Sequence, residues 1–140
     1  MAEMRILVEQ PPIIDDARKV FRLPEGAIFT YGDVIYNPSG NLIDEPLMKH
    51  EEHHSKQQGE RPELWWQRYL QDIDFRCSQE ISAYQISYQS AKTFIRDRNK
   101  LHTYLMSLAM DLSGPMYGSI ITFSEAYEAI KKPELFTFNV

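Results

Sequence analysis

Cysteine and glycine are scarce in this sequence of 140 residues, and basic residues are not in excess. Cys77 is the only cysteine, which excludes an intrachain disulfide and a cysteine-rich metal site. The six glycines form no phosphate-binding loop of the kind found in nucleotide enzymes. Acidic residues outnumber basic ones by 20 to 15, and a net charge of −5 argues against binding to phosphate backbones. We therefore predict no nucleic-acid partner.

Long hydrophobic runs are also missing. No apolar stretch approaches the ~20 residues with which a helix crosses a bilayer. Residues 1–10 carry Glu3, Arg5 and Glu9 and lack the apolar core of a secretion signal. These features predict a soluble chain with no membrane partner and a cytoplasmic location.

The composition that remains is typical of a folded domain, with 43% hydrophobic and 25% charged residues. A chain of this length fits one ordinary domain and has no room for two independent cores. We find no internal repeat, low-complexity tract or linker in the sequence. Residues 1–140 are therefore predicted to form a single domain.

Extended segments are predicted in the first forty residues. The pattern indicates a strand over 4–8, a helix over 13–21 and a hairpin with strands at 27–31 and 34–37. The hairpin strands are rich in β-branched and aromatic residues, and Gly32 and Asp33 lie between them. Two such residues are a usual hairpin turn.

Helices dominate the rest of the chain. They are predicted over 43–58, 62–70, 75–95, 100–112 and from 122 onward, with an irregular segment after 133. Thr122 and Glu125 have the Thr-x-x-Glu spacing of a capping box. A hairpin followed by helices predicts an α+β fold.

One motif stands out, the sequence His50-Glu51-Glu52-His53-His54. On a helix, the first and last histidines lie one turn apart on the same face, so both imidazoles can reach one ion at about 2 Å. Glu51 lies about 100° around the helix, where it can act as general base on a water at the metal. The alternative is a polar helix face on which histidines happen to cluster.

A third ligand is predicted at Glu80. The helix from 75 carries a mostly inward face of residues at spacings of three and four, and Glu80 lies within that face. An unpaired inward carboxylate is costly, whereas a metal ion supplies both charge and coordination. The alternative partner of Glu80 is a cation on its own helix, Arg76 or Lys92.

The pattern of His-Glu-x-x-His on one helix and a glutamate on a following helix resembles the gluzincin branch of zinc metallopeptidases. The small size and element order look most like the minigluzincins. The wider string is similar to phage- and prophage-type metallopeptidases. It comprises Ile35-Tyr36-Asn37-Pro38, the motif, Gln57-Gln58, Trp65-Trp66, Tyr69-Leu70, Gln79-Glu80-Ile81 and Ala83-Tyr84.

The resemblance implies a small zincin-like domain, in which a hairpin precedes a zinc-binding helix, a glutamate-ligand helix and further helices. It implies that His50, His54 and Glu80 bind Zn²⁺ and that Glu51 is the catalytic base. The implied activity is that of a zinc metalloendopeptidase, which hydrolyses peptide or protein substrates with a zinc-activated water.

The sequence departs from this family at Tyr84. Several gluzincins place an aspartate four residues after the glutamate ligand, where it orients a ligating histidine. The Tyr84 hydroxyl can orient a histidine or donate to the developing oxyanion, and we take it as a candidate catalytic residue. A buried core tyrosine is an equal alternative. Tyr88, His102 and Tyr117 are the other candidate donors.

The remaining notable residues receive simpler interpretations. His53 points away from the histidine pair and is predicted at the surface. Trp65 and Trp66 are predicted to anchor a helix in the core. Gln57 is predicted in a solvated turn, with a bond to a group that supports the metal ligands as the alternative. The strand over 34–37 is predicted to align the substrate.

Two other functions fit the same residues. The chain could be a catalytically inactive metal-binding or protein-interaction domain of the same fold, which a fourth protein ligand would favour. It could instead be a hydrolase of non-peptide amides, because zinc-hydroxide chemistry is general.

Overall fold

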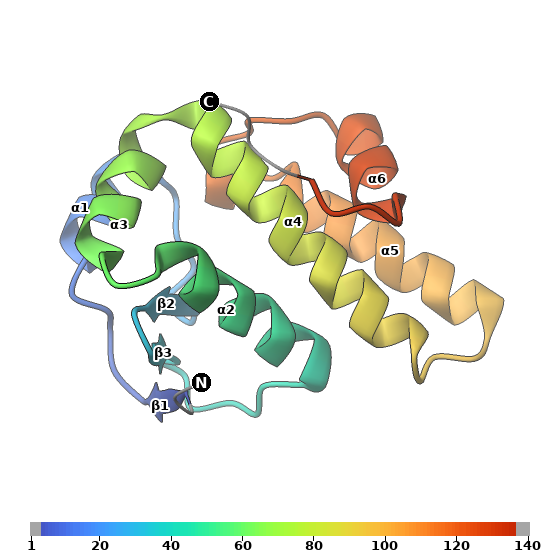
Figure 1. Ribbon diagram of the computed structural model, residues 1–140, viewed down its shortest axis with the longest axis horizontal. Coiled ribbons are helices and arrows are strands. Elements are labelled where there is room, and N and C mark those ends of the chain that lie inside the picture. Colours follow the sequence, from blue (N-terminus) through green and yellow to red (C-terminus); the bar gives the residue numbers. More distant parts are fainter. Residues whose placement is uncertain (1–3, 137–140) are drawn as a thin grey trace.

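The computed structural model describes residues 4–136 and confirms the predicted α+β class (Figure 1). One small sheet contains β1 (Arg5–Leu7), β2 (Phe29–Tyr31) and β3 (Val34–Tyr36). The helices are α1 (Ile14–Val20), α2 (Glu45–Gln58), α3 (Pro62–Gln71), α4 (Ile73–Lys92), α5 (Arg98–Leu112), the 3₁₀ helix η1 (Pro115–Tyr117) and α6 (Phe123–Lys131). Residues 133–136 are irregular, as predicted, and 137–140 lie outside the described range.

The sheet has the strand order β1-β3-β2, so the hairpin strand β3 lies at its centre. β3 pairs with β2 in the antiparallel sense and with β1 in the parallel sense. Gly32 makes the tight connection possible with a φ of +64°, a conformation that costs glycine little. Because both edges of β3 are already paired, the prediction that residues 34–37 align the substrate is wrong. β2 is the edge strand that packs against α2.

Aspartate and threonine caps set the helix starts. The Asp44 carboxylate accepts a bond from the Leu47 amide at 3.0 Å, and Asp72 and Asp97 cap α4 and α5 in the same way. These caps explain why the three helices begin within two residues of the predicted positions rather than on them. Thr122 and Glu125 form the predicted capping box at the start of α6.

Helix α4 runs through the middle of the molecule, with α2 along one side and α5 and α6 along the other (Figure 1). On the side of α5 and α6 lies the C-terminal core, formed by Ile81, Tyr84, Leu105, Leu108, Ala109, Leu112, Tyr117, Ala126 and Ile130. Around α1 and α3 lies the aromatic core, formed by Ala17, Phe21, Trp65, Trp66, Tyr69 and Phe75. Both tryptophans are therefore buried in a core, as predicted. Helix α4 contributes Phe75 to the aromatic core and Ile81 and Tyr84 to the C-terminal core, so it connects the two.

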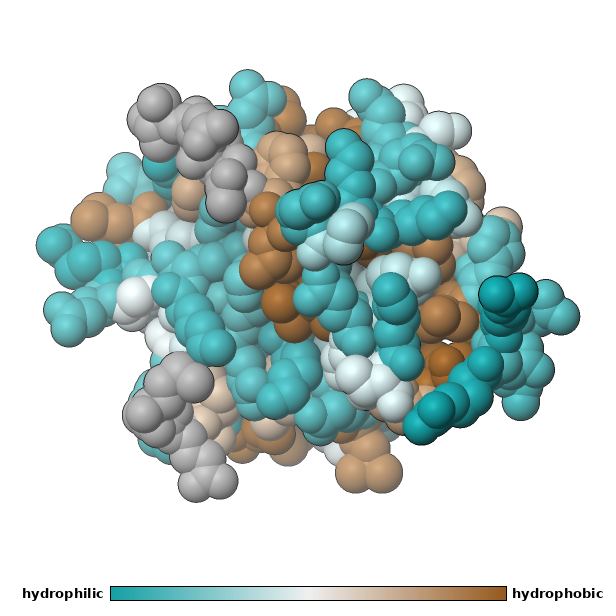
Figure 2. Space-filling model, turned by 45° about the vertical axis from the view of Figure 1, so that its right-hand side comes forward, coloured by the Kyte–Doolittle hydropathy of each residue, from teal (hydrophilic) through white to brown (hydrophobic). Residues whose placement is uncertain are grey.

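Hydrophilic side chains cover most of the face drawn in Figure 2, and apolar residues show there in scattered patches. Among the described residues, no helix combines the length and the apolar character needed to cross a bilayer.

Candidate metal centre

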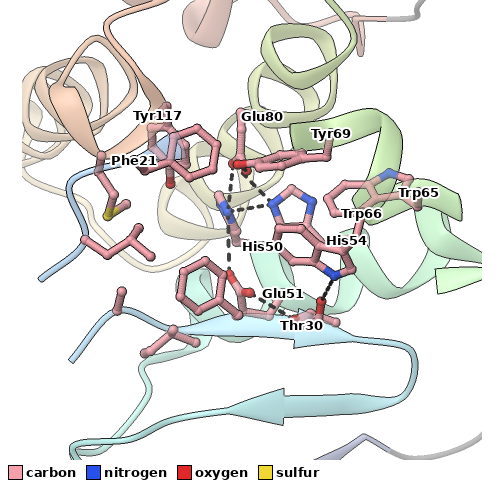
Figure 3. A pocket seen from close by; sticks show the side chains of 15 residues that line it. Phe21, Thr30, His50, Glu51, His54, Trp65, Trp66, Tyr69, Glu80 and Tyr117 are labelled. Atoms are coloured by element: carbon pink, nitrogen blue, oxygen red, sulfur yellow. Dashed lines mark hydrogen bonds and ion pairs between the residues drawn. The ribbon is translucent and has the colours of Figure 1, made fainter. Parts of the chain in front are cut away.

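Three buried side chains from two helices converge on one point (Figure 3). His50 and His54 project from α2, and Glu80 projects from the facing turn of α4. The two Nε2 atoms are 3.1 Å apart, and Glu80 Oε1 lies 3.1 Å from Nε2 of His54 and 3.4 Å from Nε2 of His50. The structure thus brings together the three residues that the motif and the inward face of α4 predict.

The triangle of these atoms has the size of one face of a zinc coordination tetrahedron. Ligand atoms about 2.0–2.1 Å from a zinc ion at tetrahedral angles lie about 3.3 Å from one another. The observed separations of 3.1, 3.1 and 3.4 Å are close to that value. Two imidazole nitrogens and one carboxylate oxygen are also a donor set that zinc prefers. These residues therefore fit a metal ion without rearrangement.

The hydrogen bonds of Gln57 fix the tautomer of His54. Gln57 Nε2 donates to the Gln79 carbonyl at 3.0 Å, which assigns the other amide atom, Oε1, to the side facing His54 Nδ1 at 2.7 Å. Because an amide oxygen only accepts, Nδ1 carries the ring proton. The lone pair of the neutral ring then lies on Nε2 and points at the convergence point.

Ser87 fixes His50 in the same way. The Ser87 hydroxyl donates to the Pro46 carbonyl at 3.1 Å and lies 3.4 Å from His50 Nδ1. With its proton committed to the carbonyl, the hydroxyl accepts from Nδ1, so His50 also turns the lone pair of Nε2 inward. Three acceptor atoms therefore face one another, an arrangement that only a proton or a metal cation can stabilise.

The electrostatics at the centre favour a cation. Burial raises the pKa of Glu80, but His54 and His50 outweigh burial and hold the pKa well below its usual range. Burial lowers the pKa of His54, but Glu80 outweighs it and raises the pKa to about 9. The second oxygen of Glu80 accepts a bond from the Tyr69 hydroxyl at 2.6 Å, which leaves Oε1 directed at the histidines.

Glu51 lies beside this group with one oxygen restrained and the other near the centre. Thr30 of β2 donates its hydroxyl to Glu51 Oε1 at 2.9 Å, while Oε2 lies 3.6 Å from His50 Nε2. Burial raises the pKa of Glu51, although the two histidines oppose this shift. A carboxylate with a raised pKa is a better proton acceptor near neutral pH.

A small cavity opens onto all four groups. It offers about 40 Å³ to water, where one water molecule needs at least about 10–15 Å³. Its walls are mostly apolar and aromatic: Phe21, Leu23, Ala27, Ile28, Phe29, Trp65, Trp66, Tyr69, Met116 and Tyr117. The lining of this one cavity thus includes both the acceptor triangle and the Glu51 carboxylate.

A second, larger cavity of about 310 Å³ adjoins the first. The two share Ile28, His50, Glu51, Met116 and Tyr117 as walls. The second cavity also has Asp44 and Asp111 in its lining and no lysine or arginine. All three residues of the metal-binding group line the first cavity, and His50 lines the second as well.

The candidate donor tyrosines occupy different places. The Tyr84 and Tyr117 hydroxyls share a hydrogen bond of 2.7 Å, and the Tyr84 ring packs edge-on against His50. Tyr117 lines both cavities, whereas Tyr84 lines only the second. Tyr88 and His102 line neither cavity. The catalytic role of Tyr84 stays a prediction, and the structure adds Tyr117 as its hydrogen-bonded partner.

Several supporting residues escaped the sequence analysis. Gln57 does not lie in a solvated turn, because its amide bonds both to His54 and to α4. His53 is half-buried rather than exposed, and its Nε2 lies 3.1 Å from the Ser82 hydroxyl. No role at the metal-binding group was predicted for Tyr69 or Ser87, because their partners are remote in the chain. The alternative ion pair of Glu80 with Arg76 or Lys92 is not among the contacts of the described residues.

Comparison with known proteins found no family model, no curated protein and no solved structure that matches this chain. The assignment of the centre therefore depends on its own geometry. What that geometry establishes is a group of two histidines and one glutamate that could bind a metal ion.

Proposed function

We propose that this chain is a zinc-dependent metalloendopeptidase of the gluzincin type, with a small zincin-like fold. The observation that carries the proposal is the triangle of two histidine nitrogens and one Glu80 oxygen, with the Glu51 carboxylate 3.6 Å from His50. A purely structural zinc site has four protein ligands, whereas a catalytic site keeps one position for water or substrate. Among the described residues, the metal-binding group contains three.

In this proposal, three residues bind the metal and a fourth transfers protons. His50, His54 and Glu80 would hold the metal, and bound zinc supplies the charge that polarises a carbonyl and makes water more acidic. Glu51 accepts a proton from the attacking water at Oε2 and later gives it to the leaving amine. Thr30 donates a hydrogen bond to Oε1 of Glu51, so Oε2 is the oxygen that accepts the proton.

The tyrosine pair supports a role in stabilising the oxyanion. Tyr117 borders the cavity next to Glu80, and its hydroxyl bonds to that of Tyr84. We assign the donation to Tyr117 and its orientation to Tyr84. A preorganised hydroxyl donor of this kind contributes about 10²–10³ in rate when it faces the developing charge.

Cleavage within a chain needs space on both sides of the scissile bond. The two cavities share Glu51 and His50 as walls, and the second, of about 310 Å³, is the one with room for substrate residues. Part of the β2 edge is unavailable for pairing, because the Thr30 carbonyl already accepts from Gln58 and Trp66. We therefore propose that an extended substrate lies along residues 27–29, which line the first cavity.

Glu51→Gln tests the catalytic role, with Glu52→Gln as its matched control one residue along α2. Glu52 pairs with Lys49 on the helix surface and is not one of the three residues of the metal-binding group. We expect zinc-loaded Glu51→Gln to keep one zinc per chain and to lose at least 10²–10⁴ in the rate of peptide cleavage. Glu52→Gln should retain both zinc and cleavage.

The zinc content of His54→Ala tests the site itself. A folded His54→Ala protein should lose the zinc that the unmodified chain holds after dialysis. If Glu51→Gln still cleaves peptides at the normal rate, the mechanism is wrong. If the zinc-loaded chain cleaves nothing in a broad peptide library, the inactive metal-binding domain replaces the peptidase as the better hypothesis.

A further inference from the structure

Arg76 is a buried arginine that forms no ion pair with a carboxylate among residues 4–136. Only 4% of the residue is exposed, and it lies one turn before Glu80 on α4. Its guanidinium stacks over the Phe21 ring at 4.6 Å. A buried charge of this kind needs other partners, since leaving it unpaired is costly.

Those partners are three backbone carbonyls from two separate segments. Nε donates to the Tyr69 carbonyl at 2.9 Å and Nη2 to the Leu70 carbonyl at 3.0 Å, both at the end of α3. Nη1 donates to the Tyr117 carbonyl at 3.1 Å, in η1. A guanidinium is a rigid planar fork, so it fixes the two segments relative to each other.

The two tyrosines held by this fork flank the metal-binding carboxylate. The Tyr69 hydroxyl donates to Glu80 Oε2 at 2.6 Å. The Tyr117 hydroxyl bonds to Tyr84, whose ring packs against His50. Arg76 is therefore connected to the metal-binding group by two routes, and each route passes through a tyrosine.

Gly118 shows how closely the η1 segment approaches Arg76. Its φ is +91°, and a Cβ atom added there would lie 3.2 Å from Arg76 Nη1. A side chain at this position would meet both backbone strain and the guanidinium. The turn after Tyr117 therefore leaves room for the Arg76 guanidinium only when residue 118 is a glycine.

We propose that Arg76 is a positioning residue, which holds Tyr69 and Tyr117 against the metal-binding group. The inference uses the metal site of the proposed function but is independent of peptide hydrolysis. As a consequence, Arg76 affects the affinity and the geometry with which Glu80 binds a metal, although Arg76 itself touches none of the three ligands. Lysine should not replace it, because one ammonium nitrogen cannot span carbonyls that three separate nitrogens reach.

Cobalt binding tests this inference with a readout that does not need activity. Co²⁺ alone is titrated into the metal-free chain, and its affinity and visible absorption are recorded for the unmodified chain, Arg76→Lys and Arg68→Lys. Arg68 is the matched control, an arginine of α3 that stacks over Phe75 at 4.4 Å and pairs with Asp72 at 3.6 Å. We expect Arg76→Lys to bind Co²⁺ about 10–100-fold more weakly, with an altered spectrum, and Arg68→Lys to match the unmodified chain.

A double-mutant cycle with Tyr69→Phe tests the route. If Arg76 acts through Tyr69, the affinity loss of Arg76→Lys combined with Tyr69→Phe is smaller than the sum of the single losses. Additive losses would overturn this route, and an unchanged Co²⁺ affinity and spectrum in Arg76→Lys would overturn the whole inference. If Arg76→Lys does not fold, Gly118→Ala disturbs the same clamp from the opposite side and should weaken Co²⁺ binding several-fold. Unchanged binding in folded Gly118→Ala would then count against the clamp.

The outcomes separate this inference from the proposed function. An unmodified chain that binds no Co²⁺ and no Zn²⁺ would remove the metal site, and the inference with it. A chain that binds the metal but shows no effect at Arg76 removes the inference alone.

Discussion

Helix α4 packs against α2 on one side and against α5 and α6 on the other, and the two contacts use different chemistry. On the α5 and α6 side, Ile81 and Tyr84 enter the C-terminal core, whose members are almost all apolar. On the α2 side, α4 presents Glu80, Ser82 and Ser87, and each has a polar partner on α2. The face toward α5 and α6 is mainly apolar, apart from Gln85, which donates to the Ala129 carbonyl of α6, whereas the face toward α2 carries the metal-binding carboxylate.

The difference between the two sides shows that the contacts that contribute most to the free energy of unfolding are not the contacts that position the metal ligands. Apolar burial contributes about 25 cal/mol per Å² and needs no exact orientation. Buried polar groups contribute little net free energy and become costly when one partner is lost. The polar contact is thus the weaker source of stability and the stronger source of specificity. Substitutions on the two sides should accordingly have opposite profiles.

Leu112→Ala should have the largest effect on stability and none on the metal. Leu112 is fully buried in the C-terminal core, so truncation leaves a cavity that costs about 2–5 kcal/mol of unfolding free energy. Urea denaturation of the metal-free chain measures this loss, and zinc per folded chain should stay at its unmodified value. A folded Leu112→Ala protein that lost its zinc would contradict the separation of the two faces.

Gln57→Leu should show the reverse profile. The substitution removes the acceptor of His54 Nδ1–H, which lies at 2.7 Å, and leaves the ring free to rotate or change tautomer. Loss of such a partner lowers metal affinity about 10–100-fold, which corresponds to about 1.4–2.7 kcal/mol. A competition titration with a chelating indicator measures it.

Gln67→Leu is the control for Gln57→Leu, since it makes the same change at an exposed position of α3. It should leave zinc affinity unchanged. Equal losses in both variants would mean that Gln57 acts through general packing and not through His54.

The same comparison explains which parts could be predicted from sequence. On the apolar side, hydrophobic spacing and the Thr122–Glu125 pair were enough to predict α5 and α6, and the capping box was confirmed in atomic detail. Local signals suffice there because each helix buries one face. Cap geometry accounts for the small errors in helix starts, as at Asp97.

On the polar side, the usual assumption that polar side chains are exposed to solvent gave wrong predictions. Gln57 and His53 were predicted to be exposed, yet the facing helix covers both. Glu80 was placed correctly because an inward carboxylate demands a cation. Tyr69 had no such signal, since its hydroxyl gains a role only when α3 and α4 meet. Only tertiary structure could reveal the residues that support the ligands.

Thr122→Ala should cause the smallest loss of unfolding free energy among these substitutions. It tests whether the two faces of α4 act independently. The Thr122 hydroxyl accepts from the Glu125 amide at 3.1 Å, and the Glu125 side chain bonds back to the Thr122 amide, also at 3.1 Å. Loss of this cap at α6 should cost about 0.5–2 kcal/mol of unfolding free energy.

Thr103→Ala, a substitution at an exposed position within α5, is the control and should cost less, because alanine favours helix interiors. Zinc affinity should be the same in both, since no residue of α6 lines either cavity next to the metal-binding group. A Thr122→Ala protein with weakened zinc binding would show that the two faces of α4 are coupled.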